Sequence, residues 1–121
     1  MQPRNDSVAA VTGATSGIGE AFARELARRG YDLLITGRRE ERIRGVAESI
    51  REASGVAVEV FLADFADEDK VRKLSETLSS LSKLDILINN AGFDRARCFH
   101  EQDVHIWKDM VQVHVQATVE L

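Results

Sequence analysis

A glycine-rich stretch near the start of the chain has the residue types of an anion-binding turn. Gly13, Gly17 and Gly19 follow the short apolar run 8–11 and precede a helical pattern of apolar residues. Glycine lets the backbone turn tightly and lets a phosphate approach the main chain, while the first N–H groups of the following helix face the anion. The order of strand, turn and helix therefore predicts a site for a phosphate or pyrophosphate.

The spacing of these glycines separates the turn from two other phosphate-binding sequences. It reads G-x-x-x-G-x-G, which is neither the G-x-G-x-x-G fingerprint nor the G-x-x-x-x-G-K-[ST] of a P-loop. No lysine follows Gly17 or Gly19, so the sequence gives little support to an ATPase. Thr15 and Ser16 add hydroxyl donors within the turn. A structural glycine turn without a ligand is the alternative interpretation.

The end of the second apolar run bears on which dinucleotide such a site would take. NAD needs a carboxylate for its ribose 2′-hydroxyl, about 20 residues beyond the glycine turn. Gly37 holds that position and has no side chain, and Arg38 follows it. A guanidinium pairs bidentately with a 2′-phosphate, so the sequence favours NADP over NAD. Arg39 and Arg42 are secondary candidates, although Arg42 suits a solvated helix face.

These residues need a framework of alternating strands and helices. Apolar runs predict strands at 8–11, 33–35, 56–63 and 84–89, with helices between them and a last helix from 103 onward. In the first helix Ile18, Phe22 and Leu26 recur every four residues, which predicts an amphipathic helix with these side chains on its buried face. The second helix is marked by Ile43, Val46, Ala47 and Ile50 and ends at Gly55, and Asp67 is expected to cap the third. The alternation implies parallel strands with right-handed crossovers, an α/β doubly wound sheet of the Rossmann type. The closing residues 118–121 contain no glycine, proline or cation, as if the last helix were cut short.

Two motifs resemble those of one enzyme family. Residues 12–19, T-G-A-T-S-G-I-G, resemble the T-G-x-x-x-G-I-G signature of the short-chain dehydrogenase/reductase family, and residues 89–92 resemble its N-N-A-G motif. The resemblance runs from about residue 7 to the end and corresponds to the N-terminal half of the family fold, with about four strands of the sheet. It implies that residues 1–121 are a single NAD(P)-binding Rossmann-type domain, incomplete relative to the family.

The same resemblance implies a set of cofactor contacts. The carboxylate of Asp64 would accept the adenine amino N–H, and the backbone N–H of Phe65 would serve a ring nitrogen; the alternative for Asp64 is a solvated turn residue. Asn90 would lie near the ribose, while Asn89 would tie strands together. The full set of expected cofactor-binding residues is Gly13, Thr15, Ser16, Gly17, Ile18, Gly19, Arg38, Asp64, Phe65, Asn90, Ala91 and Gly92.

The catalytic groups of the family are not all present. The family uses a serine and a Y-x-x-x-K pair, but the chain has one tyrosine, Tyr31, with Ile35 four residues on. The family's catalytic asparagine aligns with His114, which could hydrogen-bond a relay water or could be a partly buried helix residue. Three hypotheses follow. The chain is the cofactor-binding part of an NADP-dependent short-chain oxidoreductase acting on a small alcohol or carbonyl, a stand-alone non-catalytic nucleotide-binding or interaction module, or a nonfunctional truncation.

Composition and charge bear on the partners and the location of the protein. A net charge of −4 over 121 residues gives no electrostatic footprint for nucleic acid or an anionic membrane. One cysteine and the lack of an apolar leader or spanning run favour a soluble protein of the cytoplasm. His100 and His105 are five residues apart, about 140° on a helix, so no zinc motif forms and we expect no metal. The apolar fourth strand is expected at a sheet edge, which predicts a homo-oligomer.

Overall fold

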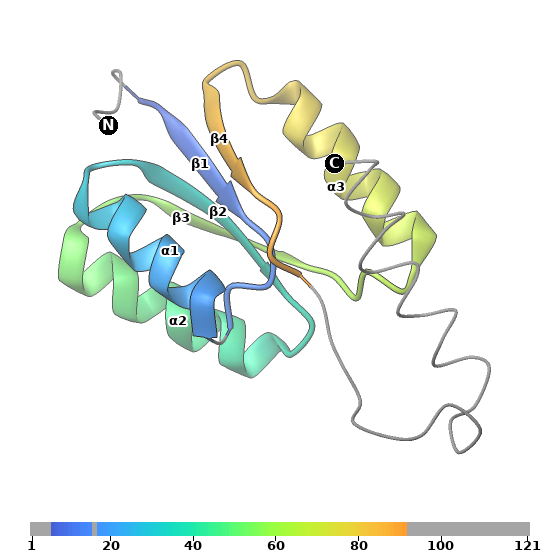
Figure 1. Ribbon diagram of the computed structural model, residues 1–121, viewed down its shortest axis with the longest axis horizontal. Coiled ribbons are helices and arrows are strands. Elements are labelled where there is room, and N and C mark those ends of the chain that lie inside the picture. The colour runs from blue at the N-terminus through green and yellow to red at the C-terminus, as the bar shows by residue number, and fades with distance from the viewer. Residues whose placement is uncertain (1–5, 16, 92–121) are drawn as a thin grey trace.

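The computed structural model of the chain describes residues 6–15 and 17–91, which form a parallel sheet of four strands with three helices (Figure 1). The strands are β1 (Val8–Val11), β2 (Asp32–Gly37), β3 (Val58–Leu62) and β4 (Leu84–Ile88). The helices are α1 (Gly17–Arg28), α2 (Glu40–Ser54) and α3 (Glu68–Ser80). The strand order β3-β2-β1-β4 confirms the predicted Rossmann-like α/β sheet. The last predicted helix, from 103 onward, lies outside the described residues.

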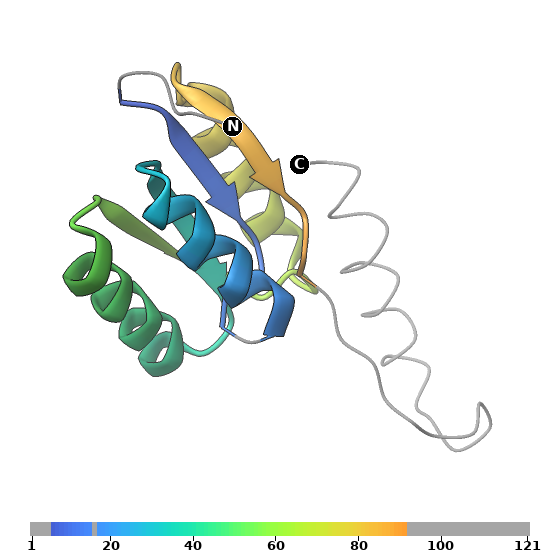
Figure 2. The ribbon, with the colours of Figure 1, turned by 60° about the vertical axis from the view of Figure 1, so that its left-hand side comes forward.

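The sheet is covered on both faces, as a doubly wound fold requires. Helices α1 and α2 lie on one face and α3 on the other, as Figure 2 shows. Because neighbouring residues of a strand point to opposite faces, Ala9 and Val11 join the core under α1 and α2, whereas Ala10 joins the core under α3. The sequence therefore builds two separate apolar layers from a single short strand.

The second and third helices follow their predicted patterns. In α2 the side chains of Ile43, Val46, Ala47 and Ile50 are buried, and Gly55 ends the helix in a left-handed conformation with φ 70°. Asp67 begins α3 as predicted, because its side chain accepts hydrogen bonds from the backbone N–H groups of the next turn. Local sequence signals were sufficient for these two helices.

The prediction for the buried face of α1 is confirmed for Leu26 and was wrong for Ile18 and Phe22. Ile18 is 67% exposed and Phe22 44% exposed, whereas the side toward the sheet carries Gly19, Ala23, Leu26 and Ala27. Small residues let the axis of α1 approach β1 and the glycine turn between them, whereas larger side chains would keep the helix farther from the sheet. The helix has two adjacent apolar stripes, and the smaller residues form the contact.

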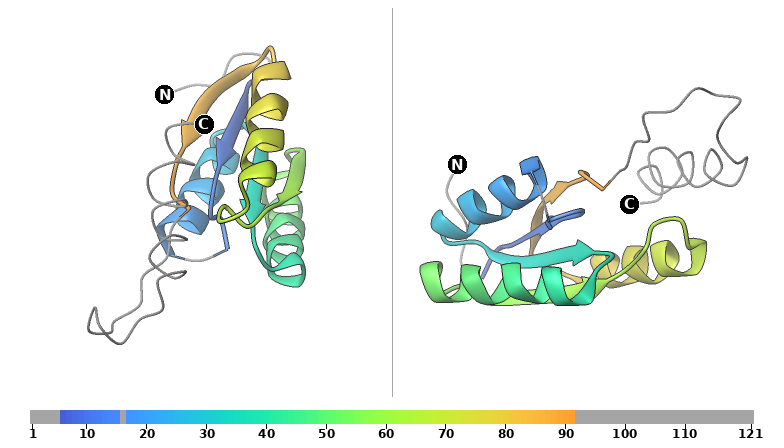
Figure 3. Two further views of the ribbon diagram at one scale, coloured as in Figure 1. Left: turned by 90° about the vertical axis from the view of Figure 1, so that its right-hand side faces the viewer. Right: turned by 90° about the horizontal axis from the view of Figure 1, so that it is seen from below.

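The topology creates a switch point between β1 and β4. The chain runs from β1 outward to β2 and β3, then returns through α3 to place β4 on the other side of β1. The arrows of β1 and β4 point the same way in Figures 1 and 3. Turns that follow these two strands therefore meet at one end of the sheet, where ligands bind in open α/β folds.

Candidate nucleotide-binding site

A pocket lies at the carboxyl end of the strands. It brings together the turn after β1, the end of β2, the segment after β3 and the segment after β4. Its walls are formed by Gly13, Thr15, Thr36, Gly37, Arg38, Arg39, Ala63, Phe65, Asn90 and Ala91. Six of the predicted cofactor-binding residues are among them, namely Gly13, Thr15, Arg38, Phe65, Asn90 and Ala91. Ser16, Gly92 and His114 lie outside the described residues.

The side chain of Thr12 joins the turn after β1 to the segment after β4. Its Oγ1 accepts hydrogen bonds from the backbone N–H groups of Asn90 at 2.9 Å and Ala91 at 3.0 Å, and its hydroxyl donates to the Ile88 carbonyl at 3.4 Å. Thr12 is 1% exposed. Sequence reasoning assigned it no role, although it opens the glycine motif. Its hydroxyl fixes the segment that carries the predicted ribose contacts.

The side chain of Asn90 adds a second tie between the two segments. The Asn90 amide donates from Nδ2 to the Gly13 carbonyl at 3.1 Å, while Asn89 is exposed. The expected role of Asn89 in joining strands stays a prediction. Asn90 both lines the pocket and holds the glycine turn.

Two glycines of the turn are required by the packing of the chain itself. Gly13 has φ +66°, and a Cβ on it would lie 2.8 Å from the Ala91 Cα. A Cβ on Gly19 would overlap the Gly13 carbonyl oxygen and the Asn90 amide nitrogen. Backbone and side-chain groups on both sides of the switch point therefore approach more closely than any L side chain would allow.

The end of β2 leaves little space for a side chain at Gly37, where NAD binding would call for a carboxylate. Gly37 is buried, and a Cβ on it would lie 2.7 Å from Thr15 Cγ2 and 3.2 Å from Ile43 Cβ. Arg38 and Arg39 follow, both exposed and both lining the pocket. The basic rim of the pocket is thus formed where β2 ends and α2 begins.

The glycine turn is also held from the side of β2 and α2. Thr36 accepts two hydrogen bonds from the turn, with Oγ1 from Gly13 N at 3.3 Å and with its carbonyl from Ala14 N at 3.0 Å. Arg42, expected on a solvated helix face, is exposed but donates from Nε to the Thr15 carbonyl at 2.8 Å. Hydrogen bonds from Thr36 of β2, Arg42 of α2 and Asn90 after β4 therefore fix the turn.

The segment after β3 places its two predicted residues differently. Phe65 is 4% exposed, packs into the core under α3 and borders the pocket. Asp64 is exposed, and its Oδ1 accepts the backbone N–H of Ala66 at 3.0 Å. Asp64 thus shapes a turn beside the pocket, and a contact with adenine stays a prediction.

Two further features are absent from the part of the chain that the structure describes. No group of three or more His, Cys, Asp or Glu side chains there could hold a metal ion. No helix within residues 6–15 and 17–91 is both long and apolar enough to cross a membrane. Tyr31, the one tyrosine of the chain, is 2% exposed and packs in the core under α1 and α2.

Comparison with known proteins gives consistent matches. Residues 7–121 match the family model described as short chain dehydrogenase. An uncharacterized oxidoreductase of Staphylococcus saprophyticus is 37% identical over 120 residues, which is 98% of this chain and 51% of that protein. A short-chain dehydrogenase from Sphingobium yanoikuyae in complex with NADPH has a TM-score of 0.90 at 32% identity, covering 94% of this chain and 44% of that one.

A third match adds a complex with substrate. L-Sorbose reductase from Gluconobacter frateurii, complexed with NADPH and L-sorbose, has a TM-score of 0.88 at 33% identity. The match covers 100% of this chain and 46% of that one. The chain therefore spans about half the length of the proteins it matches.

Proposed function

The chain belongs to the short-chain dehydrogenase/reductase family, and we propose that it is the cofactor-binding part of an NADP-dependent oxidoreductase. In this proposal residues 1–121 form one NAD(P)-binding domain, and the substrate of the whole protein is a small alcohol or carbonyl compound. The bound nicotinamide would supply or accept the hydride. The described residues of the chain would bind and orient the cofactor.

The preference for NADP rests on the end of β2. A Cβ at Gly37 would lie 2.7 Å from Thr15 Cγ2 and 3.2 Å from Ile43 Cβ, so a carboxylate side chain for the ribose 2′-hydroxyl would require these neighbours to shift. Arg38, beside it, lines the pocket and carries a guanidinium that suits a 2′-phosphate. Two similar structures contain NADPH, which supports the same choice.

The rest of the pocket fits the shared parts of a dinucleotide. Gly13 and Gly17 adopt positive φ values of 66° and 55°, and α1 begins at Gly17, so backbone N–H groups face the place of a pyrophosphate. Ile18 is 67% exposed at the start of α1, where it is available to a ligand. Asn90 and Ala91 would lie by the ribose, and Asp64 and the Phe65 backbone by the adenine.

A titration of the purified chain with NADPH and NADH tests the cofactor preference. Arg38→Ala should weaken NADPH binding by about 1–3 kcal/mol, the range for a charge-assisted contact, and should leave NADH binding nearly unchanged. Arg44→Ala is the matched control, because Arg44 pairs with Glu40 at 3.2 Å and has no part in the pocket. Equal losses for the two cofactors would refute the assignment.

A non-catalytic nucleotide-binding module is the second candidate, and it shares one expectation with the first. Tyr31 is the chain's single tyrosine and is buried, so it is not available for proton transfer. General acid–base catalysis contributes about 10²- to 10⁴-fold to such reactions. We expect the 121-residue chain to bind NADPH without oxidising it in the presence of a carbonyl substrate. Steady oxidation would contradict this and would direct attention to His114.

Self-association is also proposed. Within the described part of the chain, β4 pairs with β1 alone, and Ile86, Leu87 and Ile88 are only partly buried. An apolar edge strand with one partner invites pairing with another copy. We expect sedimentation equilibrium to show dimers or larger species at roughly micromolar concentration and above. A monomer throughout that range would contradict a homo-oligomer.

A further inference from the structure

Arg42 makes a contact that the proposed cofactor preference does not explain. Its guanidinium Nε donates to the backbone carbonyl of Thr15 at 2.8 Å, across 27 residues of sequence. Arg38 and Arg39 line the pocket, whereas Arg42 is not among its lining residues. We propose that Arg42 is a positioning residue, which holds the glycine-rich turn in the shape that receives the phosphates of a dinucleotide.

The backbone of Arg42 is firmly held. The next residue, Ile43, is fully buried in the core under α1 and α2, and its N–H donates to the Arg39 carbonyl at 3.0 Å. Ile43 also closes the space beside Gly37. The first turn of α2 is therefore fixed to the sheet, and the Arg42 side chain extends from this fixed base to the turn.

The contact changes what the turn presents to an anion. A backbone carbonyl carries partial negative charge, which opposes a phosphate nearby. By accepting from a guanidinium, the Thr15 carbonyl has its charge compensated and its direction fixed. Thr15 itself lines the pocket. Holding its carbonyl restrains the ψ torsion of Thr15, and with it the backbone from which the Thr15 hydroxyl extends.

This role differs from that of Arg38 in a measurable way. The pyrophosphate is common to NADPH and NADH, so a defect in the turn weakens both cofactors by the same factor. A defect in a 2′-phosphate contact weakens NADPH alone. The effect on binding rests on the proposed function, but the clamp on the free turn does not, so the two can be tested separately.

The first measurement needs no cofactor. The amides of Gly13 and Ala14 donate to Thr36 and report on the turn. Arg42→Gln should speed their hydrogen exchange about three- to tenfold, because local opening becomes easier when a tether is lost. Arg42→Lys keeps a charged donor and should restore part of the protection. Arg44→Gln, on the same helix and paired with Glu40, should leave both amides unchanged.

The second measurement is a titration of the same variants with NADPH and NADH. Arg42→Gln should weaken both about three- to tenfold with their ratio preserved, and Arg42→Lys should weaken both less. Unchanged exchange at Gly13 and Ala14 in Arg42→Gln would overturn the proposal, whatever happens to binding. Loss of NADPH binding alone would also overturn it and make Arg42 a phosphate contact. If exchange rises while the wild-type chain binds neither cofactor, the clamp stands and the proposed function fails.

Discussion

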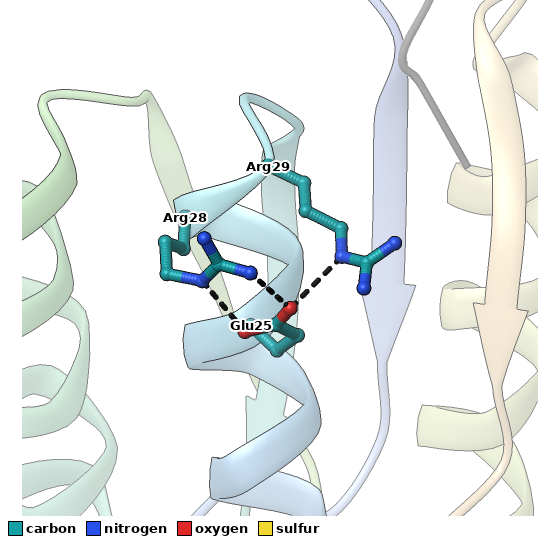
Figure 4. Close-up of polar contacts among 3 residues, drawn as sticks. All are labelled: Glu25, Arg28 and Arg29. Carbon is teal, nitrogen blue, oxygen red and sulfur yellow. Dashed lines mark hydrogen bonds and ion pairs between the residues drawn. The ribbon is translucent and has the colours of Figure 1, made fainter.

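The two ends of the sheet hold their polar groups in different ways. At the carboxyl end, buried Thr12 and Thr36 bond to backbone groups of the neighbouring turns, and the arginines border a pocket. The amino end also has exposed ion pairs: Lys83 with Asp6 at 3.0 Å, and Glu25 with both Arg28 and Arg29 (Figure 4).

This difference indicates where the chain can tolerate change. Exposed ion pairs contribute about 0–1 kcal/mol each, because water screens them. A buried N–H left without its acceptor costs about 1–3 kcal/mol. Substitutions at the carboxyl end should therefore affect both folding and ligand binding, whereas those at the amino end should have small effects on folding alone.

The largest expected effect is that of a substitution at the helical glycine Gly19, for which a second helical glycine serves as the control. Gly19→Ala introduces a Cβ that overlaps the Gly13 carbonyl and the Asn90 amide, so the turn must move. We expect a loss of about 3 kcal/mol in the free energy of unfolding, at the upper end for an overpacked site, together with loss of nucleotide binding.

Gly45→Ala is the matched substitution in α2. A Cβ on Gly45 has no neighbour within 4 Å, so alanine should stabilise the chain by about 0.5–1 kcal/mol through helix propensity. Urea unfolding measures both variants. If Gly19→Ala is as stable as Gly45→Ala, the close approach at the carboxyl end is not required for folding.

A second pair compares one hydroxyl at each end. Thr12→Val keeps the shape of the side chain but leaves the N–H groups of Asn90 and Ala91 without their acceptor, which should cost about 2 kcal/mol. Ser7→Ala removes one hydrogen bond to Asp85, 2.8 Å long, and should cost about 1 kcal/mol. Thr12→Val should also weaken nucleotide binding, and Ser7→Ala should not. Equal effects on binding would remove the distinction between the two ends.

The sequence predicts those features that depend on near neighbours. Four apolar runs predicted the four strands, and the helical spacing of Ile43, Val46 and Ile50 predicted the core of α2. The glycine turn and Arg38 were identified from type and spacing, and the structure brings both to one pocket. Periodicity and turn chemistry act over a few residues, so they can be read directly.

The features that were missed depend on residues far apart in the chain. The partners of Thr12 are 76 to 79 residues away, and Arg42 reaches Thr15 across 27. No local pattern shows that a carbonyl will lie opposite a given side chain. The exposure of Ile18 and Phe22 was missed for a related reason. The distance between helix and sheet decides which side-chain sizes fit at their contact, and this distance is not evident from the sequence.

The smallest expected effect is at the amino end and depends on pH. Hydrogen bonds from Arg28 and then Arg29 lower the pKa of Glu25 from its usual 4.5 to about 2. A carboxyl group with a lowered pKa in the folded chain stabilises it above pH 4.5, and that contribution is lost as the pH falls from 4.5 toward 2.

Glu25→Gln lacks the contribution, so the gap in unfolding free energy between the wild type and this variant should be small at neutral pH and should close across that interval. Arg28→Gln, which removes the strongest partner, should reduce the pH dependence in the same direction, and the double variant should add little more. Urea unfolding at successive pH values measures all three, and a gap that stays constant down to pH 2 would show that the pairing in Figure 4 does not lower the pKa of Glu25.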